Sequence, residues 1–173
     1  MCRSCEGSSQ EELLAENAEI IAEHGYLVTG VGDGDPPHWT YTVGLLDLVG
    51  HPELVVAGPH LEVAGALINR IGREILEGRS FAPGDVLALP DDGGTVRFGR
   101  VHSIQHRLGT FNMWHALADR GDVRATKLEV VQVFAPRTAI CRCELCRQPD
   151  LSRPESRVGV APLPPRGRAR RGR

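Results

Sequence analysis

All five cysteines of this 173-residue chain lie in its two terminal segments, and this placement constrains the fold more than any other feature of the sequence. Cys2 and Cys5 form a CxxC pair, while Cys141, Cys143 and Cys146 form a CxCxxC sequence. Two CxxC pairs can supply four thiolates to a tetrahedral Zn²⁺ ion, with bonds of about 2.3 Å. We therefore expect the two ends of one domain to converge on a shared zinc ion.

The 137 residues between Cys5 and Cys143 are compatible with such a site on energetic grounds. Closing a flexible loop of this length costs roughly 4 kcal/mol, whereas a structural zinc site contributes about 10–16 kcal/mol of apparent binding free energy. We expect Cys2, Cys5, Cys143 and Cys146 to be the ligands, with Cys141 as a spare thiol or a substitute. Four thiolates leave no position for water, so the site would be structural. Two alternatives stay open: a thiol redox sensor whose oxidation ejects zinc, and unlinked thiols.

Composition and charge favour one cytoplasmic domain. With 41% apolar residues the chain can build a single core. No apolar run approaches the ~20 residues that span a bilayer, and the N-terminus lacks the apolar region of a secretory signal, so we expect no membrane partner. Residues 153–173 carry a net charge of +6, which leaves about −8 for the rest. This acidic body argues against nucleic acid as its partner, although the arginine-rich tail allows weak contact.

We expect a single domain over residues 1–149, including the terminal cysteine cluster, and a disordered Pro/Arg-rich tail over residues 150–173. Ser9 and Glu12 have the spacing of a capping box that opens a helix ending at Gly25. His51 flanks an expected strand and is interpreted as a surface residue. Further helices are expected over residues 60–77 and 111–120, and strands over 26–31, 38–45, 53–57, 85–89, 95–104 and 128–134.

These elements do not alternate strictly between strand and helix. The pattern therefore predicts an α+β fold, with a mostly antiparallel sheet, two to three packed helices, and termini joined by the cysteine cluster.

Three segments carry a likeness to a known family: HGY at 24–26, PHWTYTVGL at 37–45 and HPELVVAG at 51–58. Through these segments and its Met-Cys-x-x-Cys start, the chain resembles the bacterial family known as domain of unknown function 4262, which is common in actinobacteria. The likeness is good over residues 1–78 and poor beyond them. The resemblance implies a shared fold without an activity, because the family has no agreed function.

The hairpin expected over residues 26–45 carries a second hypothesis. Trp39 and Tyr41 share one strand face, and Gly44 permits a bend or bulge. The simpler interpretation is a packed hairpin. The alternative is a site for flavin or another planar cofactor, built from His38, Trp39, Tyr41 and His60, which would make the chain a small oxidoreductase. Since the sequence has no nucleophile elbow, P-loop or dinucleotide fingerprint, it leaves open whether the chain is an enzyme or a binding or regulatory module.

Overall fold

The computed structural model describes residues 9–32, 38–90, 93–107, 109–138, 140 and 146–156. It confirms the α+β class: a six-stranded sheet has the strand order β1-β2-β3-β6-β5-β4. The elements are α1 (Gln10–His24), β1 (Leu27–Val31), β2 (Trp39–Val43), α2 (Leu45–Val49), β3 (Glu53–Ala57), α3 (Leu61–Leu76), β4 (Val86–Ala88), β5 (Thr95–Arg100), the 3₁₀-helix η2 (Ser103–Arg107), α4 (Asn112–Arg120) and β6 (Val130–Phe134). None of the described helices combines the length and the apolar character needed to cross a membrane.

The sheet is mixed, which corrects the prediction of a mostly antiparallel sheet. β3 and β6 run parallel in its centre, with Glu53 opposite Val130 and Val55 opposite Gln132. The other neighbouring strands pair antiparallel. Parallel neighbours require a long crossover connection, and here that crossover contains α3, β4, β5, η2 and α4. Local sequence patterns do not reveal which distant strand becomes the neighbour of β3.

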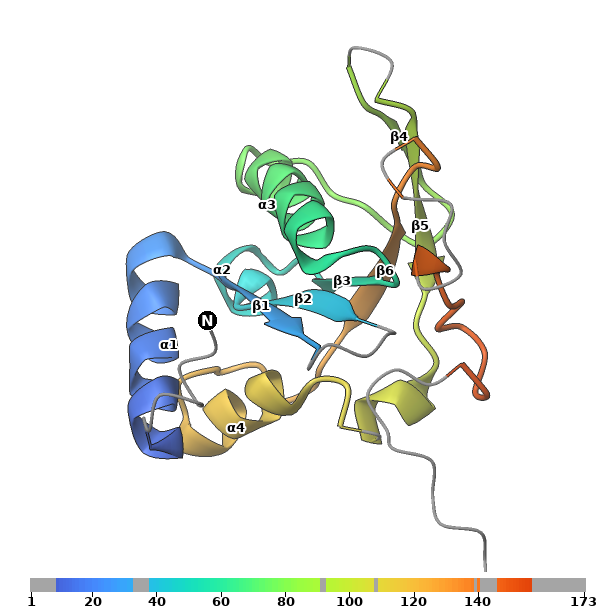
Figure 1. Ribbon diagram of the computed structural model, residues 1–173. Helices are drawn as coiled ribbons and strands as arrows, with labels where there is room; N and C mark the ends of the chain where they lie inside the picture. Colours follow the sequence, from blue (N-terminus) through green and yellow to red (C-terminus); the bar gives the residue numbers. More distant parts are fainter. Residues whose placement is uncertain are drawn as a thin grey trace, which may run out of the picture.

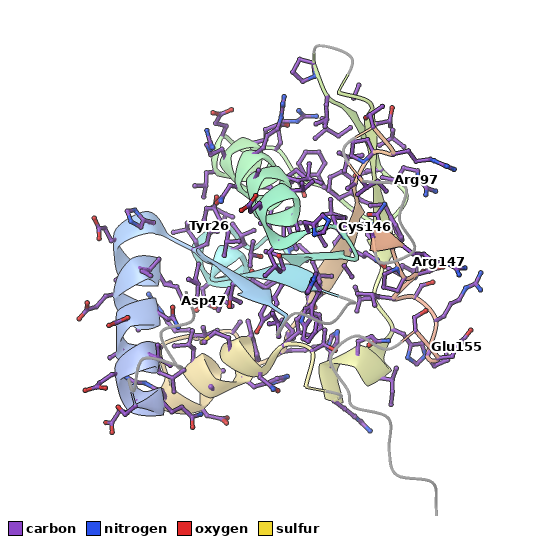
Figure 2. All side chains as sticks on the ribbon, viewed as in Figure 1. Tyr26, Asp47, Arg97, Cys146, Arg147 and Glu155 are labelled. Atoms are coloured by element: carbon purple, nitrogen blue, oxygen red, sulfur yellow. The ribbon has the colours of Figure 1, made fainter. Side chains whose placement is uncertain are left out.

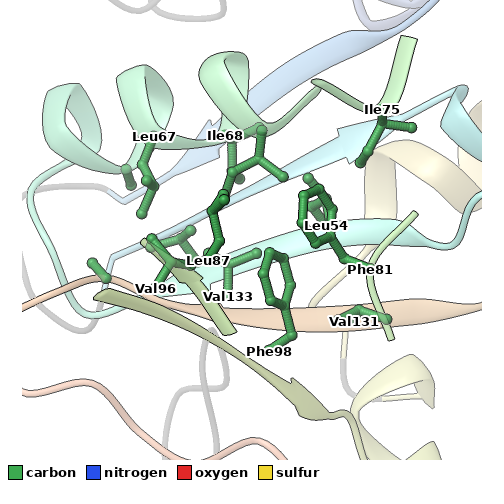
Figure 3. Packing of buried hydrophobic residues seen from close by; sticks show 14 of the residues in the cluster. Leu54, Leu67, Ile68, Ile75, Phe81, Leu87, Val96, Phe98, Val131 and Val133 are labelled. Carbon is green, nitrogen blue, oxygen red and sulfur yellow. The ribbon is translucent and has the colours of Figure 1, made fainter. Parts of the chain in front are cut away.

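Helices cover both faces of the sheet: α3 lies on one face, and α1 and α4 lie on the other (Figure 1). Figure 3 shows the apolar stripe of α3 packed against β3, β5 and β6, where it meets Leu54, Phe98 and Val133. Each fully buried Leu or Ile contributes about 1.5–3 kcal/mol relative to exposure. The buried residues of the helix are Ala64, Leu67, Ile68, Ile71, Gly72 and Ile75.

The first helix begins and ends where the sequence predicts. The Ser9 hydroxyl accepts a hydrogen bond from the Glu12 amide at 3.2 Å, and the Glu12 carboxylate accepts one from the Ser9 amide at 2.8 Å. Gly25 ends the helix with a left-handed φ of 86°. The capping box is therefore confirmed in both of its hydrogen bonds.

The second strand is shorter than predicted, because Gly44 turns the chain into a helix that the sequence pattern does not reveal. Gly44 has a φ of 115°, and a Cβ there would lie 2.9 Å from the carbonyl oxygen of Gly25. A residue with a side chain would be strained in this conformation. Leu45 therefore starts α2 instead of continuing β2. With α2 the described part of the chain has four α-helices, more than the two to three expected.

Candidate functional site

Glu53 forms the centre of a buried polar corner at the junction of β2, α2 and β3. Its carboxylate is 1% exposed and accepts hydrogen bonds from the Thr42 hydroxyl at 2.6 Å, the Gly44 amide at 2.8 Å and the Leu46 amide at 3.3 Å. The Thr42 oxygen in turn accepts from the Leu54 amide at 2.9 Å. Burial raises the pKa of Glu53, and its three donors oppose that rise. The carboxyl thus satisfies amides at the start of α2 that have no partner within that helix.

His51 belongs to the same corner and is buried, which corrects its interpretation as a surface residue. It is 4% exposed. Its Nδ1 lies 2.7 Å from the carbonyl oxygen of Pro52, and its Nε2 accepts a hydrogen bond from the Phe81 amide at 3.0 Å. This arrangement needs a neutral ring with the proton on Nδ1. Burial lowers the pKa of His51, in agreement with a neutral, structural histidine.

The four residues of the hypothetical cofactor site do not line a common surface. Trp39 and Tyr41 are 6% and 1% exposed and belong to the core beneath α1 and α4. Trp39 Nε1 donates to the carbonyl oxygen of Thr110 at 2.8 Å, and the Tyr41 hydroxyl accepts from the Met113 amide at 3.0 Å. Burial raises the pKa of Tyr41.

His38 and His60 lie on the side of α3 instead. His38 precedes Trp39 on the strand and is half-buried, with its ring close to Gly32. His60 is exposed at the N-cap of α3. The two segments meet through the Gly58 amide, which donates to the carbonyl oxygen of His38 at 2.8 Å. Because Trp39 and Tyr41 pack in the core beneath α1 and α4, the two histidines and the two aromatic residues do not form one site.

Of the five cysteines, the structure describes Cys146, which is 3% exposed. Cys2, Cys5, Cys141 and Cys143 lie outside the described residues. Within the described ranges no group of three or more His, Cys, Asp or Glu side chains could hold a metal ion. Because these ranges include a single member of the expected ligand set, the zinc site and the junction of the termini stay predictions.

The chain after Cys146 forms a C-terminal strap (residues 146–156) that two glutamines fasten to the sheet. The Gln148 side chain accepts from the Ala135 amide at 2.7 Å and donates to the Ala135 carbonyl oxygen at 2.9 Å. Gln132 on β6 is fully buried. It donates to the carbonyl oxygen of Pro149 at 2.6 Å and accepts from the Leu151 amide at 2.8 Å. Leu151 is itself fully buried, so the strap is part of the folded body.

The strap also closes against the end of β3. Gly58 has a φ of 105°, and a Cβ there would lie 2.5 Å from the carbonyl oxygen of Arg147. This close approach requires glycine. Residues 150–156 belong to the expected tail, and of these Leu151 is buried while Arg153 and Ser156 accept hydrogen bonds from the Gln105 side chain through their carbonyl oxygens. Residues 157–173 lie outside the described part, so the disordered tail stays a prediction. Figure 2 shows Cys146, Arg147 and Arg97 on the same flank of the molecule.

A groove of about 660 Å³ lies between the strap and the β4–β5 pair, lined by Arg97, Arg100, Phe134, Gln148 and Asp150 among others. The sequence does not reveal this groove, because its lining comes from β5 and from the strap, which are remote in the chain. One local signal was present: Arg97 and Gly99 share the face of β5 opposite Val96 and Phe98, which are buried. That alternation already predicts an arginine on the solvent-facing side.

The fold and its polar interior define the chain as an α+β protein with a mixed sheet covered by helices on both faces. The chain belongs to the family described as Domain of unknown function (DUF4262), whose model matches residues 20–137. This match contains the Glu53 corner and β5, and it ends before the strap. No curated protein and no solved structure matches the chain.

Proposed function

We propose that this chain is a zinc-stapled binding module in which a Zn²⁺ ion ties the N-terminal segment to the C-terminal strap. The observation that supports it is the position of Cys146, buried at the start of a strap that Gln148 and Gln132 hold against the sheet. A thiolate held in this way is shielded from solvent and fixed in position, as a structural zinc ligand needs.

The weak anchoring of α1 gives the staple a physical role. None of the residues of α1 is buried, and its contacts are mainly with α4 and β1. Segments held by so few buried contacts fray unless they are tied down. Cys2 and Cys5 precede α1, so a Zn(Cys)₄ centre formed with Cys143 and Cys146 would link this helix to the opposite part of the body. A reducing compartment such as the cytoplasm would keep these thiols available for zinc.

Metal analysis of the full chain purified under reducing conditions tests this proposal. We expect about one zinc per chain in the wild type and in Cys141→Ser, the matched control, because four thiolates remain in this variant whether Cys141 is a spare thiol or a substitute ligand. The double variant Cys2→Ser/Cys5→Ser should lose the metal while keeping its secondary structure. Wild-type protein with less than about a tenth of an equivalent of zinc would contradict the staple.

Peroxide separates a static staple from a thiol redox sensor. A sensor would release zinc on treatment with hydrogen peroxide and rebind it after reduction, because oxidised thiolates no longer coordinate the metal. Zinc content that stays constant under the same treatment would exclude the sensor and leave the structural role. The burial of Cys146 favours the second result.

A further inference from the structure

Two hollows on the flank of the strap share part of their lining, and together they are called the arginine groove. The larger, of about 660 Å³, lies over β5 and is lined by Arg97 and Arg100. The smaller, of about 460 Å³, is lined by Arg147 and Arg153. Gln148 and Asp150 line both hollows, so the two are neighbours along the strap. An occupant of the whole groove would be elongated and would meet arginines at several points.

Three of these arginines are exposed and carry an uncompensated charge. Arg97, Arg100 and Arg147 form no ion pair with any other residue that the structure describes. Some other arginines of the surface are paired with an acidic side chain, as Arg120 is with Asp122 at 2.8 Å. The groove is therefore a local positive site on a body that is acidic overall.

The acidic residues of the groove are already engaged with the protein. Asp150 accepts hydrogen bonds from the Ser152 amide at 3.0 Å and the Ser152 hydroxyl at 2.6 Å, and it pairs with Arg153 at 3.4 Å. Asp85 accepts from the Ala82 amide at 2.7 Å. These contacts hold both carboxylates in place, and neither forms an ion pair with Arg97 or Arg100.

The floor of the groove orders Arg97 before any ligand arrives. Its guanidinium lies over the ring of Phe134, 5.3 Å from the ring centre. Gly99 leaves room for that ring, because a Cβ at this position would lie 2.6 Å from Phe134 Cε2. A stacked guanidinium is restricted in its rotamers and keeps its N–H groups free for a carboxylate. Val86, which is 62% exposed, adds an apolar side chain to the rim.

From this combination we infer that the arginine groove binds an extended acidic peptide segment of a partner protein. Separate arginines along an open groove match carboxylates spaced along a peptide, and Val86 and Phe134 offer contacts for its apolar side chains. A nucleic acid fits less well, because its continuous phosphate backbone would have to pass the carboxylates of Asp85 and Asp150, whereas a peptide can place acidic side chains at the arginines and neutral ones beside those carboxylates. The inference rests on the proposed role as a binding module and is independent of zinc.

Fluorescence anisotropy tests the inference with a labelled peptide of alternating glutamate and valine, titrated with the full zinc-replete chain. Arg97→Gln/Arg100→Gln should weaken binding about tenfold or more, since it removes two charge-assisted contacts. The matched control is Arg79→Gln: Arg79 also stacks on a phenylalanine, Phe81, at 5.1 Å, but it pairs with Glu74. This control should bind within about twofold of the wild type.

Further measurements separate the groove from the tail and from other kinds of ligand. The tail after residue 156 also carries arginines, so binding that is equal in the wild type and in Arg97→Gln/Arg100→Gln would assign it to the tail and overturn the inference. A single-stranded oligonucleotide that binds the groove more tightly than the peptide would overturn it as well. The inference also fails if the wild type does not bind the peptide but self-associates, and Arg97→Gln/Arg100→Gln abolishes that self-association. Zinc measured on the same samples separates the two proposals. A chain that holds a full equivalent of zinc and does not bind the peptide would contradict peptide binding in the groove and would leave the zinc proposal standing.

Discussion

The corner around Glu53 and the groove around Arg97 use polar side chains in opposite ways. At the corner the carboxylate of Glu53 has three donors from its own chain, and both ring nitrogens of His51 have backbone partners. In the groove Arg97, Arg100 and Arg147 are exposed and have no acidic partner among the described residues. Buried polar groups must be satisfied within the fold, whereas exposed unpaired cations are available to another molecule.

Two of the segments that resemble the family, TVGL at 42–45 and HPEL at 51–54, have a structural role at the corner. In TVGL, Thr42 and Gly44 donate to the carboxylate of Glu53, and Leu46 follows directly. In HPEL, His51 ties the chain before β3 to Phe81. Both segments therefore serve to build the junction of β2, α2 and β3. Changes at the corner should reduce stability, and changes in the groove should reduce binding.

The largest effect is expected from Glu53→Ala. It leaves the Thr42 hydroxyl and the Gly44 and Leu46 amides without their acceptor in a buried place, which should cost about 3 kcal/mol of the free energy of unfolding. Glu53→Gln retains an oxygen acceptor and should cost about half as much. Urea denaturation followed by circular dichroism measures both. A loss below about 1 kcal/mol for Glu53→Ala would show that the corner is not required for stability.

A smaller effect is expected from Gln132→Ala, which releases the strap. The carbonyl oxygen of Pro149 and the amide of Leu151 lose their buried partner, at a cost of about 2 kcal/mol. Hydrogen exchange across residues 146–156 should accelerate more than exchange in α3. Gln148→Ala is the comparison: it also removes a fastening of the strap, but its effect should be smaller because Gln148 is half-buried and water can replace its contacts. Equal protection of the strap in the wild type and Gln132→Ala would contradict the assigned role of this glutamine.

The smallest effect is a dependence on pH at His51. Burial lowers its pKa in the folded chain, so below the ordinary value near 6.5 the unfolded chain binds more protons than the folded one. Stability should therefore fall as the pH drops below about 6.5. His106 also has a pKa lowered by burial, so the test compares the wild type with His51→Gln, which keeps an acceptor for the Phe81 amide. Parallel stability curves for the two proteins between pH 7.5 and 5.5 would show that His51 does not contribute.

The features recovered from the sequence are those whose cause is local. The capping box of α1 needs four consecutive residues, and the stripe of α3 repeats every three to four residues. The strand Glu53–Ala57 is recovered with both of its ends because His51 and Pro52 precede it and Gly58 follows it. The short helix α2 was missed, because five residues carry too little periodicity to separate a helix from the end of a strand.

For the candidate site the sequence named Trp39, Tyr41, His38 and His60, and it did not name the residues of the groove. Trp39 and Tyr41 carry the residue types of a binding site, but the packing of α1 and α4 on the sheet buries them. Arg97 and Arg147 are ordinary charged residues in the sequence. They become notable once β5 and the strap lie side by side without acidic partners for them among the described residues.

By itself the sequence determined the α+β class, the caps of α1 and the apolar faces of the main helices and strands, because these depend on residues within a few positions of one another. It also placed every cysteine near an end, from which the zinc staple is proposed. Tertiary structure decided the parallel pairing of β3 with β6, the burial of Glu53 and His51, and the fastening of the strap by Gln132 and Gln148. Each of these depends on which distant segments become neighbours, and that is settled by the packing of the whole core.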